Sequence, residues 1–198
     1  IPIPLPIADF TPIAPDDLIP KALNISPDFN PDLIVHLSDV HIPINLHIKR
    51  HDEYTGVFEN LYTELANLSS NKLIIITGDL VNTKLRTDNE TIIMAQNFLS
   101  KLSSIAPTIV IIGNHDFAEN NLERADSIEA ICNALPQIHV LKTTGIYTIN
   151  NMYFVFNSLF DLKFIRRTDV HTDKPVYALY HGSLVGATMD NGTTIKSP

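Results

Sequence analysis

Residues 72–80 read KLIIITGDL, and this stretch decides the fold class. Its centre is an apolar, β-branched run, which predicts a buried strand. The run ends in Gly78 and Asp79, where a strand gives way to a loop. We therefore expect a buried strand with a carboxylate directly after its carboxyl end.

Two further runs, one on each side of this stretch, show the same arrangement. LIVHLS at 33–38 leads into Asp39 and His41, and TIVII at 108–112 leads into Gly-Asn-His-Asp at 113–116. Each run is short, apolar and rich in β-branched residues, as buried strands are. Polar residues therefore follow three predicted strands at the same relative position.

Helical patterns separate these strands. Residues 52–68 place apolar side chains at three- and four-residue spacing, which is typical of an amphipathic helix. Thr87, followed three residues later by Glu90, is a capping-box signature and predicts the start of the next helix. A third helix is predicted from about 122 to 135. Because alternating strands and helices are typical of parallel βαβ units, we predict an α/β fold.

The pattern after the third helix changes to closely spaced strands. Asparagines at 150 and 151 suit a two-residue hairpin turn between two of them, since asparagine tolerates positive φ. We expect a mainly antiparallel part here. The predicted strands are Ile138–Lys142, Gly145–Ile149, Met152–Asn157 and Val176–Tyr180.

Composition limits the class of protein. The 198 residues are 44% hydrophobic, enough for one domain with a substantial core. A net charge of −8 argues against nonspecific adhesion to nucleic acid over the whole surface. One cysteine excludes a disulfide framework and a thiolate zinc cage. No stretch approaches the roughly 20 apolar residues of a membrane span, and the start lacks the basic residues of a secretory signal, so we expect an intracellular protein without membrane contact.

The first 31 residues differ from the rest of the chain. They hold eight of the 13 prolines and show neither helical nor strand periodicity. We interpret residues 1–31 as an extended arm or linker. The domain itself is predicted to comprise residues 32–198.

The polar residues that follow the strands form the candidate site. In an open α/β sheet the carboxyl ends of parallel strands share one rim, where sites form. The last predicted strand also ends in a histidine, so four segments would deliver side chains to one pocket. These side chains are Asp39, His41, Asp79, Asn114, His115 and His181.

Carboxylate and imidazole ligands without thiolates suit divalent ions such as Mn²⁺, Fe²⁺ or Zn²⁺. So many ligands favour a two-metal centre with ions about 3.5–4 Å apart, in which Asp79 can bridge. Such a centre activates water and neutralises charge on a phosphate, which predicts phosphoester hydrolysis. Each motif alone is also an ordinary turn or loop cluster, and only their joint placement after strands favours a metal site.

The motifs LSDVH, GDLVN, GNHD and YHG together resemble the calcineurin-like metallophosphoesterase superfamily in order and rough spacing. The resemblance covers most of the chain from Leu33 onward and implies a four-layer αββα sandwich. It implies that Asp39 and His41 ligate a first metal and that Asp79 bridges two. The ligands implied for the second metal are Asn114 and His181.

The same resemblance assigns the catalytic roles. His115 corresponds to the histidine that contacts the phosphate and protonates the leaving oxygen. Asp116 is implied as its orienting partner.

The segments between the motifs resemble, more narrowly, SbcD-type DNA-repair exonucleases, especially their phage and large-virus relatives. The segments are KRHDEYTGVFENLYTEL at 49–65, IAPTIVIIGNHD at 105–116 and YHGSLVGATMDNG at 180–192. This resemblance implies a Mn²⁺-dependent nuclease acting on DNA ends and hairpins, with Fe²⁺, Zn²⁺ or Mg²⁺ as alternative metals. It also implies a homodimer and an SbcC-type coiled-coil ATPase as partners.

Four side chains near the first two motifs are candidates for substrate binding: Asn82, Lys49, Arg50 and Lys84. The basic ones could meet phosphates near the metal rim, and a solvated surface is an equal alternative. In the nucleases that resemble this chain, the position of Asn82 usually holds a histidine. The amide of asparagine can donate a hydrogen bond to a phosphate, but it cannot transfer a proton as a histidine acid can.

A second departure concerns the end of the sequence. The superfamily adds a final Gly-x-x-His type motif with further histidine ligands, and residues up to Pro198 contain none. We therefore expect a C-terminally incomplete domain that lacks this motif and the DNA-facing cap domain.

Two other functions stay open at this stage. A phosphatase or phosphodiesterase for small nucleotides or phosphoproteins would use the same ligands, because substrate choice depends on loops. A non-catalytic scaffold with this fold would be marked by loss of ligands, and the six candidates are all present.

Overall fold

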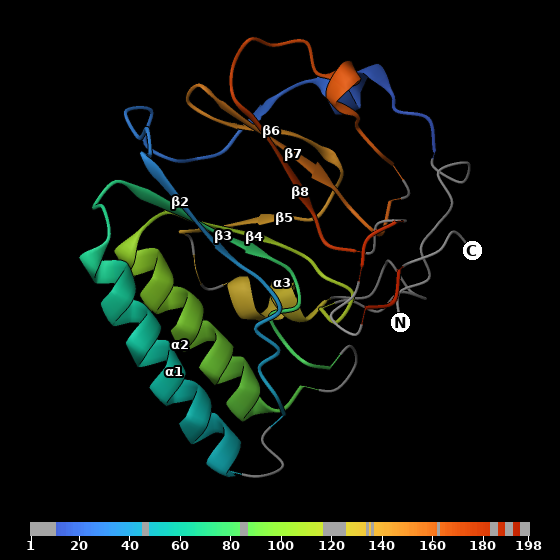
Figure 1. Cartoon of the computed structure of the whole chain (residues 1–198). Coiled ribbons are helices and arrows are strands. Elements are labelled where there is room, and N and C mark those ends of the chain that lie inside the picture. Colours follow the sequence, from blue (N-terminus) through green and yellow to red (C-terminus); the bar gives the residue numbers. More distant parts are fainter. Residues whose placement is uncertain are drawn as a thin grey trace.

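The computed structural model of the chain is an α/β structure with two sheets (Figure 1). It describes residues 11–44, 48–83, 87–116, 126–133, 135, 137–161, 163–182, 186–188 and 192–194. Within these residues no helix is both long enough and apolar enough to cross a membrane.

The first sheet is fully parallel. Its strands, in spatial order, are β2 (Leu33–Leu37), β3 (Lys72–Thr77), β4 (Thr108–Ile111) and β5 (Ile138–Leu141). Spatial order follows chain order, and crossovers between parallel strands are right-handed, so each connecting helix falls on the same face. Figure 1 shows the helices on one side of this sheet. They are α1 (Ile48–Asn67), α2 (Asn89–Ile105) and α3 (Ser127–Cys132).

Burial on both faces explains why β3 and β4 are continuous apolar runs. Helices cover one face of the first sheet and the second sheet covers the other (Figure 1). All residues of β3 and β4 are buried accordingly. On the helix side, Phe58 of α1 stacks on Phe98 of α2 with ring centroids 4.2 Å apart.

The helix starts differ from the sequence prediction in one detail. The N-cap of α2 is Asp88 rather than Thr87, and its carboxylate accepts a hydrogen bond of 2.7 Å from the N–H of Thr91. Both residue types cap helices well, so the sequence did not distinguish the two neighbours. α3 is capped in the same way by Asp126 and is shorter than predicted, although residues 117–125 lie outside the described part of the chain.

The second sheet has the strand order β1 (Lys21–Ala22), β6 (Gly145–Ile149), β7 (Met152–Asn157) and β8 (Val176–Tyr180). Its side chains alternate between two apolar clusters, as the period of a strand requires. Phe154 and Phe156 face the main core, whereas Val155 joins a smaller cluster with Ile165 and Val170 on the outer face.

The expectation of a mainly antiparallel second part is wrong. Among the named strands of the described residues, only β6 and β7 pair antiparallel, through a hairpin in which Asn150 has a φ of 49°. β5 follows a helix and therefore enters the first sheet as another parallel strand. β8 returns after a long connection and lies parallel to β7.

The proline-rich segment lies along the second sheet. Its described part holds the short 3-10 helix η2 (Pro15–Leu18) and β1, which pairs with β6. Lys163 donates to both carboxylate oxygens of Asp17 at 2.8 and 2.9 Å. With η3 (Arg167–Asp169), η2 covers the outer face of this sheet, where the described residues form 3-10 turns rather than α-helices. The two packed sheets, with a layer of helices on the outer face of the first, agree with the predicted fold class.

Candidate metal centre

The carboxyl ends of the strands bring the predicted site residues together. Loops after β2, β3 and β4 contribute residues from the first sheet, and β8 contributes a histidine from the second. The candidate centre therefore lies where the two sheets meet. The residues brought together are Asp39, His41, Asp79, Asn114, His115 and His181.

Two neighbouring loops hold an unusual backbone conformation. Asp39, His41 and Asp79 have φ values of 55°, 50° and 54°, in the left-handed region that non-glycine residues rarely adopt. Each such residue costs about 1–3 kcal/mol. The loops support one another, because the N–H groups of Asp39 and His41 donate to the carbonyls of Gly78 and Asp79 at 3.2 and 2.9 Å. Strain that the surrounding structure maintains is typical of functional sites.

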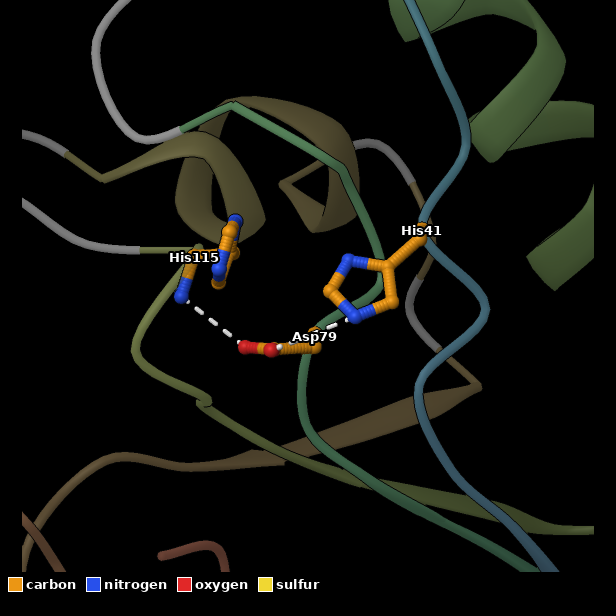
Figure 2. Close-up of side chains that lie close together, drawn as sticks. All are labelled: His41, Asp79 and His115. Atoms are coloured by element: carbon orange, nitrogen blue, oxygen red, sulfur yellow. Dashed lines mark hydrogen bonds and ion pairs between the residues drawn. The ribbon is translucent and has the colours of Figure 1, made fainter. Parts of the chain in front are cut away.

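Asp79 is the centre of the cluster (Figure 2). Its side chain is buried, and Oδ1 accepts a hydrogen bond of 2.9 Å from the N–H of His115. Nε2 of His41 lies 3.5 Å from Oδ2, and Nε2 of His181 lies 3.3 Å from Oδ1. Histidines from two different segments therefore face the two oxygens of one carboxylate.

Among the described residues, two groups of three side chains could each hold a metal ion. One group is His41, Asp79 and His115, and the other is Asp39, Asp79 and His181; within each, the ligand atoms lie within 4.8 Å of one another. Asp79 belongs to both groups. A carboxylate placed in this way can bridge two ions.

The chemistry of His181 fits a cation. Its Nδ1 lies 2.7 Å from the carbonyl oxygen of Thr77, which can only accept, so Nδ1 carries a proton. Its Nε2 then faces two acceptors, Oδ1 of Asn114 at 3.1 Å and Oδ1 of Asp79 at 3.3 Å. A lone pair opposite two oxygens is unfavourable unless a proton or a metal ion lies among them. The donor set of imidazole, carboxylate and amide oxygen suits a divalent ion.

The pKa values of the pair reflect the same electrostatics. Burial raises the pKa of Asp79, but hydrogen bonds from His181 and from the N–H of His115 outweigh it and bring the pKa below the ordinary value. Burial lowers the pKa of His181, but the interaction with Asp79 outweighs it and raises the pKa. The site therefore favours a carboxylate next to positive charge.

His41 also has a side-chain atom without a hydrogen-bond partner among the described residues. Its Nε2 lies 3.6 Å from Oδ1 of Asp39, in addition to its contact with Asp79. Within the described residues, Nδ1 of His41 is buried and has no hydrogen-bond partner. Buried polar atoms are rarely left unpaired, so this imidazole fits a site that holds a further group.

His115 is held differently from the prediction. Its Nδ1 lies 2.8 Å from the backbone carbonyl of Asn82, and its ring packs edge-to-face on His41 with centroids 4.9 Å apart. Asp116, expected to orient it, instead accepts from the N–H groups of Gly113 and Val81 at 2.9 and 3.2 Å. Asp116 therefore joins the loops after β3 and β4, and the Asn82 carbonyl orients His115.

Asp116 is fully buried among these groups. Burial raises its pKa to about 6, although the hydrogen bonds from Gly113 and Val81 lower it. Its carboxylate is therefore a structural acceptor.

The predicted substrate-binding residues are less closely connected with the site. Arg50 is exposed on α1, and its Nε lies 3.6 Å from the carboxylate of Glu53. The side chain of Asn82 is exposed, so it stays a candidate for phosphate contact. Lys84 and the side chain of Lys49 lie outside the described residues.

Two residues beside the ligands were missed from the sequence. The hydroxyl of Ser38 donates to the carboxylate of Asp39, and the hydroxyl of Tyr54 donates to the carbonyl of His41 at 3.0 Å. Tyr54 lies in the helical pattern predicted for residues 52–68. Its polar tip, in a helix directly after the first motif, was the available signal.

Comparison with known proteins gives a consistent result. Residues 33–191 match the family model described as calcineurin-like phosphoesterase. The chain is 33% identical over 173 residues to the uncharacterized protein R555 of Acanthamoeba polyphaga mimivirus, covering 80% of this chain and 13% of that protein. It is 30% identical over 125 residues to 244L of Invertebrate iridescent virus 6, named as a candidate phosphoesterase, covering 61% of this chain and 41% of that protein. The chain thus spans well under half the length of these curated relatives.

Proposed function

Because this chain belongs to the calcineurin-like phosphoesterase family, we propose that it hydrolyses phosphodiester bonds with two divalent metal ions and that its substrate is DNA. The observation that carries the proposal is the position of Asp79, which is shared by two groups of ligands at the strand ends. A shared carboxylate between two groups of nitrogen and oxygen ligands suits a two-metal centre.

Each side chain has a defined task in this proposal. As the family resemblance implies, Asp39 and His41 would hold one ion, Asn114 and His181 would hold the other, and both ions would share Asp79. The groups seen in the structure divide differently, because His41 groups with His115 and Asp39 with His181 around the shared Asp79. Bound ions of this kind supply an activated water and neutralise charge on the phosphate oxygens. The Asn82 carbonyl fixes the proton of His115 on Nδ1, which leaves Nε2 to interact with the substrate. In its protonated form, His115 can donate from Nε2 to the leaving oxygen.

Mn²⁺ is the metal that we propose. Imidazole nitrogens combined with carboxylate and amide oxygens suit Mn²⁺, and they also suit Fe²⁺ and Zn²⁺. Mg²⁺ is a weaker match, because it prefers oxygen ligands and retains several waters. Titration with each ion separates these possibilities.

Support for DNA as substrate comes from the sequence. The segments around the motifs resemble SbcD-type nucleases, and Lys49, Arg50 and Lys84 follow the first two motifs. Basic side chains near a metal rim suit a phosphate backbone. We extend the proposal to the partners of such nucleases, a second copy of the chain and an SbcC-type coiled-coil ATPase. A phosphatase acting on small nucleotides or phosphoproteins is the alternative.

The test compares substrates on the same protein. The purified chain is incubated with Mn²⁺ and either linear DNA, bis-p-nitrophenyl phosphate or p-nitrophenyl phosphate. We expect cleavage of DNA and of the diester, lost in Asp79→Ala and His115→Ala but retained in Asp16→Ala, an exposed carboxylate on η2. Hydrolysis of the monoester alone would favour the phosphatase. Equal behaviour of wild type and both site variants would disprove the two-metal proposal.

A further inference from the structure

The loop that carries Asp39 and His41 lies outside the named helices and strands and is held from two sides. On one side, its N–H groups pair with the loop after β3: those of His41 and Ile42 donate to the carbonyls of Asp79 and Leu80, both at 2.9 Å. The carbonyls of His41 and Pro43 in the same loop accept hydrogen bonds from other donors. The donors come from the helices.

Three side chains of α1 and α2 donate to these two carbonyls. The hydroxyl of Tyr54 donates to the backbone carbonyl of His41 at 3.0 Å. Nε2 of His51 lies 2.8 Å from the carbonyl of Pro43, and the hydroxyl of Thr91 donates to the same carbonyl at 2.9 Å. A carbonyl oxygen can only accept, so Nε2 of His51 carries the proton.

The three donors are anchored in the helix core. Thr91 is 1% exposed and His51 is 9% exposed, so both polar side chains are buried. The ring of Tyr54 packs edge-to-face on Phe58, which itself stacks on Phe98 of α2. Burying a polar group is unfavourable unless it forms a hydrogen bond, and apolar side chains would pack at these positions without that requirement. The arrangement therefore connects a rigid helix pair to the loop.

This connection matters because the loop is strained. Asp39 and His41 keep positive φ values of 55° and 50° only while neighbouring groups hold them there. Relaxation of the loop would turn the imidazole of His41 away from the carboxylate of Asp79. Metal ligands function only when they stay within about 0.5 Å of their productive positions.

We propose that Tyr54, His51 and Thr91 are positioning residues, which hold Asp39 and His41 in the geometry that binds metal. The proposal rests on the proposed function, since it requires that these two residues are ligands. It adds that the helix pair, which itself supplies no ligand, sets the affinity of the centre.

Calorimetric titration with Mn²⁺ tests the proposal on the purified chain, without need of a substrate. Tyr54→Phe removes a single oxygen and keeps the ring, and we expect it to weaken binding by about 10-fold or more, as loss of an outer partner of a metal ligand does. Tyr62→Phe is the matched control, since Tyr62 lies on the same helix and, among the described residues, forms no hydrogen bond to the loop. We expect it to bind as wild type.

A second pair of variants separates positioning from general stability. Thr91→Val keeps the shape of the side chain and removes the donor, whereas Thr91→Ser restores a hydroxyl. We expect Thr91→Val to bind Mn²⁺ more weakly than wild type and Thr91→Ser to bind it about as well as wild type. Likewise, we expect His51→Phe, which has no donor, to bind Mn²⁺ more weakly than His51→Gln, which keeps one. Thermal unfolding of the metal-free proteins shows whether affinity simply follows stability, which would overturn the proposal.

The outcomes distinguish this proposal from the proposed function. If wild type takes up Mn²⁺ and all the variants bind it equally well, the positioning role is wrong and the two-metal centre stands. If wild type takes up no divalent ion, the proposed function fails and the positioning role fails with it.

Discussion

Gly113 illustrates how closely single residues pack around the centre. A Cβ atom added to it would collide with Oδ1 and the backbone nitrogen of Asp79. We expect Gly113→Ala to displace this carboxylate and to weaken Mn²⁺ binding by about 100-fold or more, because even outer partners of ligands account for 10- to 100-fold. Calorimetric titration measures the effect.

Gly78 provides a second test of the same packing. Its φ is +89°, and an added Cβ would lie 2.7 Å from Nδ1 of His181 and 2.8 Å from the Cα of Gly113. Gly78→Ala should therefore reduce binding as well. Gly186→Ala, which has a similar φ of +87° but no described atom within 4 Å of an added Cβ, should not. Normal binding in both site variants would contradict the contacts around Asp79.

At the residue scale, the sequence predicted which residues approach the centre but not their partners. Asp39, Asp79 and His115 follow predicted strands, and topology alone brings such residues to one rim. The role of Asp116 was misjudged, because adjacency to His115 does not reveal that its carboxylate turns to the N–H groups of Gly113 and Val81. The positive φ values were also not predictable, since the residues concerned are not glycines.

Gly56 is a weak point of α1. It lies within the helix, and an added Cβ would meet no atom of the described residues within 4 Å. Because glycine loses more backbone entropy on folding than alanine, Gly56→Ala should stabilise the protein by about 0.5–1 kcal/mol. Chemical denaturation gives the free energy of unfolding, and Mn²⁺ affinity should stay unchanged. A loss of stability would mean that this face of α1 is covered by something else.

The start of α2 offers a test between neighbouring caps. Asp88→Ala removes the side chain that accepts from the N–H of Thr91 and should cost about 1 kcal/mol in the free energy of unfolding. Thr87→Ala should cost clearly less, because Thr87 precedes the cap. Denaturation curves of the two variants provide the comparison. A larger loss for Thr87→Ala would support the capping box predicted from the sequence.

At the element scale, the positions of the strands along the chain were predictable, whereas their parallel or antiparallel direction was not. The runs that predicted β2, β3 and β4 agree with the observed strands to within one residue at each end. The direction of β5 and β8 was misjudged, because alternating apolar residues appear in parallel and antiparallel strands alike. Direction depends on the connection: α3 precedes β5, and eighteen residues separate β7 from β8.

At the scale of the whole molecule, the two sheets come into contact at the candidate metal centre. His181 comes from the second sheet, and its Nδ1 bonds to the carbonyl of Thr77 in the first. Ions held between Asp79 and His181 would therefore link the two sheets, and binding should stabilise the fold. At a free Mn²⁺ concentration of about 100 times Kd, the expected gain is about 2.7 kcal/mol.

Thermal unfolding with and without Mn²⁺ measures this gain. Asp79→Asn should abolish it, whereas Asp16→Asn, which makes the same change in charge on exposed η2, should retain it. A metal-dependent rise in Tm that persists in Asp79→Asn would mean that the ion binds elsewhere.

The stability of the metal-free protein should also depend on pH through a residue far along the first sheet. His139 lies half-buried in β5, and burial lowers its pKa below the ordinary value of 6.5. The unfolded chain therefore binds a proton on this histidine more readily than the folded protein does. The contribution of neutral His139 is fully present above pH 6.5 and is lost as pH falls through the folded-state pKa.

Other groups titrate in the same range, so the test must isolate His139. His181 and Asp116 both have raised pKa values, and each makes its own contribution to the pH profile. A comparison of wild type with His139→Gln in the presence of a chelator cancels these contributions, because the variant keeps both groups and cannot titrate at 139. The stability of His139→Gln relative to wild type should rise as pH falls from 7 to 5. A difference between His139→Gln and wild type that stays flat over this pH range would mean that β5 opens readily enough to protonate the His139 ring without cost.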